Sequence, residues 1–501
     1  MTRRPISVRT STLFVAVMAA VAAASLAPAV SAAPATARPN VIVILSDDQG
    51  YGDVGVHGCK DIRTPHLDSI ARDGVRLTNG YVSAPQCSPT RAGLMTGRYQ
   101  QRFGHESNRA VPDSSLDLKQ TTLAAVLKRA GYATGLVGKW HLGIDEKHHP
   151  QSRGFDEFFG FLGGANPYLP RGPRKVVPRI LRGRKPVGET AYLTDAFGRE
   201  AVAFIERHRK QPFFLYLAFN APHGPLEASE KYLRRFPGIK DPKRRTYAAM
   251  VSAMDDAVGR VLGKLRAAGL EEKTLIFFLS DNGGPTEVNA SSNAPLRGVK
   301  GEVREGGIRV PFFVRWKGRL PAGKTFDQPV IQLDVFPTVL AAAGIKPPAL
   351  GSRIRENSGG ERPDGRILTN SATPARLDGV NLLPWLSGKR TDAPHEVLYW
   401  RFNFPFRQPA RHKWAIRQGD WKLFTDLDAN RRRKKQQVPE TGRVMLVNVA
   451  KDIGERRDLS AAEAQKVKAL RELWEKWNAQ LATPKAPEPK RRKRKKKSRT
   501  D

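Results

Sequence analysis

The chain has 501 residues, of which 40% are hydrophobic, 27% charged and 8% aromatic. This composition excludes a wholly disordered chain, and the length allows one large core with a smaller domain or two to three ordinary domains. The net charge of +37 predicts a surface that attracts polyanions, and it does not by itself distinguish nucleic acid, anionic lipid and sulfated polysaccharide.

Residues 1–33 have the pattern of a secretory signal peptide. Three arginines precede an apolar run from Leu13 to Pro28, and small residues follow at Val30–Ala33. The alternative is a membrane anchor, but the run is short and alanine-rich for a span of about 20 residues. We therefore expect an exported protein, periplasmic or extracellular, that is not an integral membrane protein after cleavage.

The sequence contains only two cysteines, Cys59 and Cys87, so at most one disulfide can form. Exported proteins of this size often use disulfides as structural cross-links. Cysteine is therefore not used here as a general structural cross-link, and a thiol retained without that role indicates a chemical function.

Alternating strand and helix patterns predict an α/β domain over residues 39–345. Short apolar runs indicate buried parallel strands at 41–45, 213–219 and 275–279, and more weakly at 135–138. Helical periodicity lies between them, at 122–130, 196–208 and 247–268. The expected fold is a large mixed, mostly parallel sheet with helices on both faces.

The rest of the chain predicts a small α+β domain over 376–483, after a connection at 346–375 that is rich in Pro, Gly, Ser and Arg. Short alternating runs at 397–400, 412–417, 421–424 and 445–449 indicate an antiparallel sheet. A terminal helix is expected over 459–481, with Ser460 as its cap.

Two basic segments, 171–185 and the tail 484–501, are expected to be unstructured. Each is interpreted either as a solvated, flexible segment or as a tether or guide for an acidic polymer.

Polar residues follow the predicted strands at their carboxyl ends, where ligands bind in a doubly wound sheet. Asp47 and Asp48 follow the first strand, and Asp281 and Asn282 follow 275–279. A lone Asp-Asp pair is more often a turn or a helix cap. Two such clusters at one sheet edge repel, and they indicate a hard cation such as Ca²⁺ or Mg²⁺ rather than zinc.

Three further polar residues lead into the same crevice. His223 follows the strand at 213–219, and Lys139 and His141 follow the strand at 135–138. A single histidine is more often structural than catalytic, but two at one crevice with a lysine suit an anionic ligand. The residues alone predict a metal-assisted site for an anionic substrate.

The segment C-S-P-T-R-A-G-L-M-T-G-R, which begins at Cys87, resembles the signature of the type I sulfatases of the alkaline phosphatase superfamily. A second family element, G-Y-A-T-G-L-V-G-K-W-H, ends at His141. The other matching elements are Pro39-Asn40 into Asp47-Asp48, Pro222-His223, Asp281-Asn282-Gly283-Gly284, and Lys300 ahead of Glu305-Gly306-Gly307. Asp378-Gly379-Val380, Trp421-Lys422-Leu423 and the segment 452–459 resemble the family's C-terminal domain, so the matches cover nearly all of the chain after the leader.

The resemblance implies that a maturation enzyme oxidises Cys87 to formylglycine (3-oxoalanine). The hydrated aldehyde offers two hydroxyls, one to attack sulfur and one to expel sulfate later. The resemblance also implies one Ca²⁺ per chain, bound by the formylglycine oxygen and by the side chains of Asp47, Asp48, Asp281 and Asn282.

The same resemblance implies roles for the remaining polar residues. Arg91 would hold the formylglycine, and Lys139 and Lys300 would bind sulfate oxygens. His223, with Lys300, would protonate the departing alcohol, and His141 would assist the hydroxyl that expels sulfate.

The expected activity is sulfuric ester hydrolysis of the arylsulfatase type, with a sulfated carbohydrate as natural substrate and no specific nucleic-acid partner. Two alternatives stay open. One is a phosphate or phosphonate ester hydrolase on the same fold, which commonly uses Thr or Ser with two zinc ions. The other is a non-catalytic polyanion-binding protein.

Overall fold

The computed structural model describes residues 1–2, 38–106, 108, 115–173, 175–347, 376–403, 412–426 and 443–484. The described residues from Arg38 onward form one compact unit. Except for Met1 and Thr2, the predicted signal peptide lies outside the described residues, as do most of the predicted connection and the basic tail. Within the described ranges, no helix combines the length and apolarity needed to cross a membrane.

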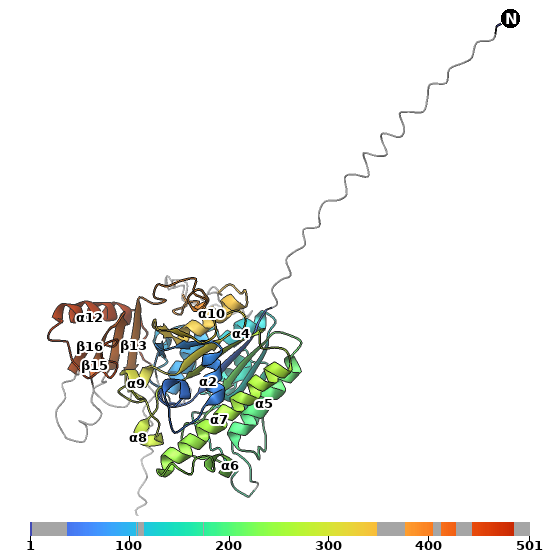
Figure 1. The fold of residues 1–501 in the computed structure, drawn as a ribbon, viewed down its shortest axis with the longest axis horizontal. Coiled ribbons are helices and arrows are strands. Elements are labelled where there is room, and N and C mark those ends of the chain that lie inside the picture. Colours follow the sequence, from blue (N-terminus) through green and yellow to red (C-terminus); the bar gives the residue numbers. More distant parts are fainter. Residues whose placement is uncertain are drawn as a thin grey trace, which may run out of the picture. The chain divides into compact units, whose positions relative to one another are not determined.

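A ten-stranded sheet lies at the centre of the larger unit (Figure 1), in the order β11-β2-β10-β9-β1-β8-β4-β5-β6-β7. The five strands from β9 to β5 in this order are parallel, and β10 joins β9 antiparallel. The strands are β1 (Asn40–Ser46), β2 (Val75–Leu77), β4 (Ala133–Lys139), β5 (Glu157–Phe161), β6 (Leu181–Arg182), β7 (Lys185–Pro186), β8 (Phe213–Ala218), β9 (Thr274–Ser280), β10 (Phe312–Arg315) and β11 (Lys324–Phe326). A separate pair joins β3 (Gly80–Tyr81) and β12 (Val330–Ile331).

Both faces of this sheet are buried, which explains why its central strands are almost continuously apolar. Successive side chains of β1 enter opposite cores: Val41 and Val43 face one core, and Ile42 and Ile44 face the other. The first core takes residues from α3 (Cys87–Thr96), α4 (Leu123–Arg129) and α10 (Val335–Ala342), and the second from α2 (Pro65–Arg72), α5 (Leu193–His208) and α7 (Pro242–Ala267). The predicted α/β architecture with helices on both faces is confirmed.

The C-terminal part is an antiparallel sheet that packs against one helix (Figure 1). Its elements are β13 (Val397–Asn403), β14 (His412–Gln418), β15 (Trp421–Asp426), β16 (Arg443–Asn448) and α12 (Ala464–Asn478). Trp474 and Trp477 of α12 share a core with Trp400 of β13. Tyr81 of β3 and Ile308 of the short helix α9 (Glu305–Ile308) belong to the same core. A continuous apolar cluster therefore joins the C-terminal sheet to β3 and α9 of the larger part of the fold.

Short helices complete the described chain: α6 (Glu230–Leu233), α8 (Thr286–Asn289), α9 (Glu305–Ile308), α11 (Leu383–Leu386), and the 3₁₀ turns η1 (Gly55–His57), η2 (Gln100–Phe103), η4 (Glu146–His148), η5 (Pro150–Arg153) and η6 (Gln332–Asp334).

Two expectations from the sequence are wrong. Ser460 does not cap the terminal helix, which begins at Ala464 with Glu463 as its N-cap residue; the Glu463 amide, which a Ser460 cap would bind, donates to the Leu459 carbonyl (3.0 Å) instead. The segment 171–185, apart from the undescribed residue 174, is structured: it forms isolated bridges and the β6–β7 hairpin. Three of its arginines pair with carboxylates: Arg171 with Glu227, Arg182 with Glu200 and Arg184 with Glu146.

Candidate active site

Strand register brings the two predicted acidic pairs together. Ser46 lies opposite Ser280 in the parallel β1–β9 ladder, and the Asp281 amide donates to the Ser46 carbonyl at 3.1 Å. Asp47 and Asp281 therefore leave adjacent strands side by side. β8 and β4 also end at this edge, where the first leads into the His223 loop and the second ends at Lys139.

Helix α3 carries Cys87 to the same edge. Cys87 is the first residue of the helix, and its side chain is buried. The Cys87 Sγ lies 3.4 Å from Asp47 Oδ1 and 3.2 Å from Lys300 Nζ. Asp47, Asp48, Cys87 and His223 each offer one ligand atom, and these four atoms lie within 4.8 Å of one another. Carboxylates, a sulfur and an imidazole nitrogen thus converge on one point.

Arg91 lies one helical turn after Cys87 and connects three strands. Its Nε and Nη2 donate to Asp281 Oδ2 at 3.0 and 2.8 Å, and its Nη1 donates to the Lys139 carbonyl at 3.1 Å. Lys139 Nζ in turn donates to Asp47 Oδ2 at 2.5 Å. The four side chains are fully buried, so these charge-assisted bonds lack competition from water.

Asp48 is the second carboxylate of the site with several polar partners. Its Oδ1 accepts from Asn282 Nδ2 at 2.7 Å and from Lys300 Nζ at 2.6 Å, and its Oδ2 lies 3.6 Å from His223 Nε2. The backbone of Asp48 has φ of 62°, a conformation that costs free energy and is common at functional sites. Within the described ranges, Asn282 Oδ1 is buried without a hydrogen-bond partner.

Burial and neighbouring charges separate the pKa values of the acidic groups. Burial raises the pKa of Asp281, and the adjacent Asp47 carboxylate raises it further. Burial also opposes ionisation of Asp47, but Lys139 and the other nearby cations outweigh it, so the pKa of Asp47 is lowered. Burial, followed by the Asp281 charge, raises the pKa of the Cys87 thiol well above its usual value. The thiol is therefore protonated at neutral pH.

His141 lies beside this cluster on a strained backbone, with φ of 60°. Its Nε2 contacts the Asn108 carbonyl at 2.9 Å, and its Nδ1 is buried without a partner among the described residues. Burial, and then the charge of Lys139, lower the pKa of His141 well below the usual value. A neutral imidazole of this kind can accept a proton.

All ten predicted site residues thus lie at one edge of the sheet, with His141 at its margin. Sequence reasoning missed two polar contributors. Ser88 donates to the His141 carbonyl at 2.6 Å, and Asn289 Nδ2 donates to the Asp48 carbonyl at 3.1 Å. Ser88 was detectable as part of the Cys87 motif, whereas Asn289 carries no sequence signal.

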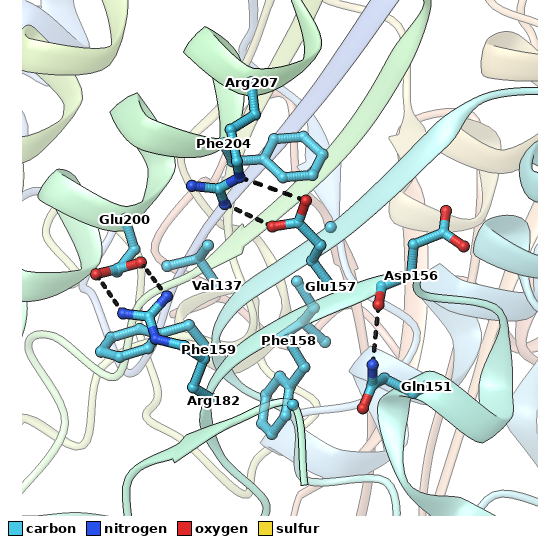
Figure 2. A pocket seen from close by; sticks show the side chains of 13 residues that line it. Val137, Gln151, Asp156, Glu157, Phe158, Phe159, Arg182, Glu200, Phe204 and Arg207 are labelled. Carbon is cyan, nitrogen blue, oxygen red and sulfur yellow. Dashed lines mark hydrogen bonds and ion pairs between the residues drawn. The ribbon is translucent and has the colours of Figure 1, made fainter. Parts of the chain in front are cut away.

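A separate pocket of about 440 Å³ lies near the starts of β4 and β5 (Figure 2). Figure 2 shows that its two arginines are paired with carboxylates: Arg182 with Glu200 (2.7 Å), and Arg207 with Glu157 (2.5 Å). Its charges are already neutralised and none of the predicted site residues lines it, so it is a poor candidate for binding an anionic substrate.

Buried acids and cations at the strand ends of this fold form a site suited to an anionic ligand. A family model described as "Sulfatase" matches residues 39–345. The N-acetylgalactosamine-6-sulfatase of Mus musculus is 35% identical and covers 79% of this chain and 75% of its own length. The steryl-sulfatase of Mus musculus is 33% identical, and the match covers 82% of this chain and 75% of the steryl-sulfatase.

Solved structures agree with these relatives. Ps i-CgsB in complex with k-i-k-neocarrahexaose is 35% identical, covers 89% of this chain and 94% of its own, and superposes with a TM-score of 0.77. The chain belongs to the sulfatase family and is a sulfuric ester hydrolase.

Proposed function

We propose that this enzyme hydrolyses sulfate esters with a formylglycine nucleophile made from Cys87, assisted by one bound Ca²⁺. The observation that carries the proposal is the position of Cys87 Sγ, 3.2 Å from Lys300 Nζ and 3.4 Å from Asp47 Oδ1. The thiol stands where the hydroxyls of the hydrated aldehyde would lie, next to carboxylates and a cation.

The donor set suits calcium. Asp47, Asp48 and Asp281 offer carboxylate oxygens, the ligands that hard cations prefer. Asn282 Oδ1, buried without a partner among the described residues, supplies the neutral oxygen of such a set. Bound Ca²⁺ would act as a Lewis acid on the sulfate group and favour the ionised nucleophile.

The state of the thiol supports conversion of Cys87 rather than direct thiolate chemistry. Reactive cysteines lower their pKa with helix termini or cations, and the pKa of Cys87 is raised by burial despite two nearby lysines. Formylglycine supplies a geminal diol, whose hydroxyls attack and later release the sulfuryl group. Arg91, fixed by Asp281, lies one turn away and would orient this diol.

The remaining cations surround the place of the sulfate. Lys139 and Lys300 would bind sulfate oxygens and neutralise charge as the S–O bond breaks. His223 is partly exposed and faces Asp48 at 3.6 Å, so it can reach both the ester oxygen and solvent as the acid. His141, held neutral by burial and Lys139, would accept the proton of the hydroxyl that releases sulfate.

We further propose an exported enzyme acting on a sulfated carbohydrate, matured by a formylglycine-generating enzyme. Two observations support the carbohydrate: the relatives include an N-acetylgalactosamine-6-sulfatase, and one similar structure holds a neocarrahexaose. The net charge of +37 suits a polyanionic substrate. Aryl sulfates should serve as substrates in vitro.

The alternative of a two-zinc phosphate or phosphonate hydrolase has less support. Such a site commonly takes Ser or Thr where this chain has Cys87, and the described residues contain one candidate metal cluster, that of Asp47, Asp48, Cys87 and His223. Aryl sulfate and aryl phosphate hydrolysis, each measured with and without a chelator, separates the two functions. Faster hydrolysis of the aryl phosphate than of the aryl sulfate, together with a requirement for zinc, would favour the alternative.

The proposal is tested by Cys87→Ala in a host that makes formylglycine. Turnover of an aryl sulfate should disappear while the melting temperature stays near that of the wild type, because the contribution of Cys87 is chemical. Mass spectrometry of the wild-type peptide should find the aldehyde in place of the thiol. Cys59→Ala is the matched control and should retain activity. Active wild-type protein with an unmodified Cys87 thiol would refute the proposed nucleophile.

A further inference from the structure

A buried charge cluster lies between the C-terminal sheet and α9, outside the active site. Lys422 of β15 donates from Nζ to Glu305 Oε1 at 2.7 Å and to Glu455 Oε1 at 2.8 Å, and the three side chains are fully buried. Glu455 Oε2 also accepts from the Glu305 amide at 2.8 Å. Tyr81 donates to the other Glu305 oxygen at 2.6 Å. Burying charged groups is costly, so such a cluster persists only where its charges are paired.

Glu305 begins α9, and α9 packs against the loop that holds Asn282. The Gly283 amide donates to the Gly307 carbonyl at 3.1 Å. A Cβ at Gly283 would lie 1.8 Å from the Gly306 carbonyl oxygen, so the two backbones touch with no room for a side chain. Any shift of α9 is therefore transmitted directly to the residue beside Asn282.

A second lysine of the C-terminal sheet holds the segment that carries Lys300. Lys413 Nζ of β14 donates to the Gly301 carbonyl at 2.7 Å. The Gly301 amide donates to the Pro85 carbonyl at 2.8 Å, two residues before Cys87. The residue that follows Lys300 is thus fixed on one side by the C-terminal sheet and on the other by the start of α3.

We propose that Lys413 and Lys422 are positioning residues, through which the C-terminal sheet sets the place of the Lys300 ammonium beside Cys87. Neither lysine touches the reacting atoms. Lys413 acts on the backbone next to Lys300, and Lys422 acts through Glu305 on the helix that ends the same loop. The inference rests on the proposed role of Lys300 as a sulfate ligand.

The test is a double-mutant cycle between Lys413→Met and Lys300→Ala, with an aryl sulfate as substrate. Rates are normalised to the aldehyde content at position 87. Lys300→Ala alone should lower kcat/KM by about 100-fold, as for loss of an oxyanion donor. Lys413→Met alone should lower it by about 10-fold or more, because small misplacements of a catalytic group are costly. In the Lys300→Ala background, Lys413→Met should have no further effect.

Each other outcome is decisive. An equal fold-loss from Lys413→Met in both backgrounds, or no loss in the native background, overturns the positioning role and leaves the proposed function intact. An unchanged rate in Lys300→Ala removes the proposed role of Lys300 itself, and the inference with it. A readout besides turnover is inhibition by inorganic sulfate, which Lys413→Met should weaken.

Lys422→Met extends the test. It removes the cation that Glu305 and Glu455 share and leaves Arg309, 3.3 Å from Glu305 Oε2, as a cation at Glu305, so a drop in melting temperature is expected together with the loss of rate. Lys422→Arg should restore part of both, because the charge returns. Lys451→Met is the matched control: Lys451 is exposed at the turn after β16, and its loss should change neither rate nor melting temperature. A Lys422→Met protein with native kcat/KM would overturn the role of Lys422.

Discussion

The site residues form a formally balanced set of charges. Three carboxylates face three permanent cations: Asp47, Asp48 and Asp281 against Arg91, Lys139 and Lys300. A divalent ion added to this set leaves an excess of positive charge, which matches an anionic ester approaching an ionised nucleophile. The burial of these groups strengthens each pairing, so the arrangement favours binding an anion over a neutral substrate.

Residue types at strand ends were enough to predict most of the acidic groups, because parallel strands must meet at one edge. Asp47 and Asp281 followed from this rule alone. Cys87, in contrast, needed the family resemblance, since α3 brings it from another part of the chain. The partners of Asn289 and Lys422 could not be predicted, because their contacts depend on tertiary packing between segments more than 30 residues apart.

Removal of the Asn282 amide should weaken calcium binding. Asn282→Leu keeps a similar size but deletes the buried oxygen that has no partner among the described residues. A ligand that binds only the folded state raises stability by about 2.7 kcal/mol at 100 times its Kd. Melting temperatures of wild type and variant, each measured with a chelator and then with added Ca²⁺, give the calcium-dependent shift. The variant should have the smaller shift, and equal shifts would place the ion elsewhere.

At the scale of elements, strands were easier to predict than helix ends and loops. The sheet strands are apolar on both faces, so their runs stand out, and the four central ones lie within one or two residues of their predicted bounds. The start of α12 was misjudged because the Glu463 amide, which a Ser460 cap would bind, is taken by the Leu459 carbonyl, and the helix begins only at Ala464. The hairpin β6–β7 was missed because its arginines suggested a solvated segment, although acidic partners on other elements, such as Glu200, neutralise them.

One pairing between elements should make stability depend on pH. His395, just before β13, lies 2.8 Å from Asp334 Oδ1 at the end of η6. Burial lowers the pKa of His395, but the Asp334 carboxylate outweighs it, so the pKa is raised above the usual value. The stabilisation is then complete below the unfolded-state pKa of about 6.5, and it is lost as the pH rises through the folded-state pKa.

The variant His395→Asn isolates this contribution. The difference in free energy of unfolding between wild type and variant, measured by chemical denaturation, should be larger at about pH 5.5 than at about pH 9. Comparison at each pH cancels the other titrating groups. A difference that is constant with pH would mean that folding does not raise the pKa of His395, and a difference that grows with pH would mean that folding lowers it.

Over the whole molecule, the ten-stranded sheet positions the proposed reacting groups, and the C-terminal sheet contacts the segments that carry some of them. The candidate metal cluster lies at the edge of the ten-stranded sheet, whereas the C-terminal sheet buries Lys413 against Gly301 and Lys422 against Glu305 and Glu455. The alternation of strand and helix predicted this two-part fold, but the sequence pattern carries no information on which surfaces join the parts. Much of the basic charge, including the run Lys490–Lys497, lies outside the described residues.

The net charge of +37 should make the enzyme discriminate between substrates by their charge. A sulfated oligosaccharide with several sulfates is attracted over a distance, whereas a monosulfated aryl ester gains little beyond the active site. The Debye length falls from about 10 Å at 0.1 M salt to about 3 Å at 1 M, so added salt removes the long-range part. Between these salt concentrations, kcat/KM for the oligosaccharide should fall by about 10-fold or more, and that for the aryl ester much less.

Deletion of residues 484–501 separates the tail from the rest of the surface in this experiment. If the tail supplies the attraction, kcat/KM of the truncated enzyme for the oligosaccharide should already be as low at about 0.1 M salt as that of the full-length enzyme at about 1 M salt. Its aryl ester turnover should be unchanged. If the remaining surface supplies it, the salt dependence should persist after truncation. Parallel salt curves for the two substrates in the full-length enzyme would show that the excess charge has no part in substrate capture.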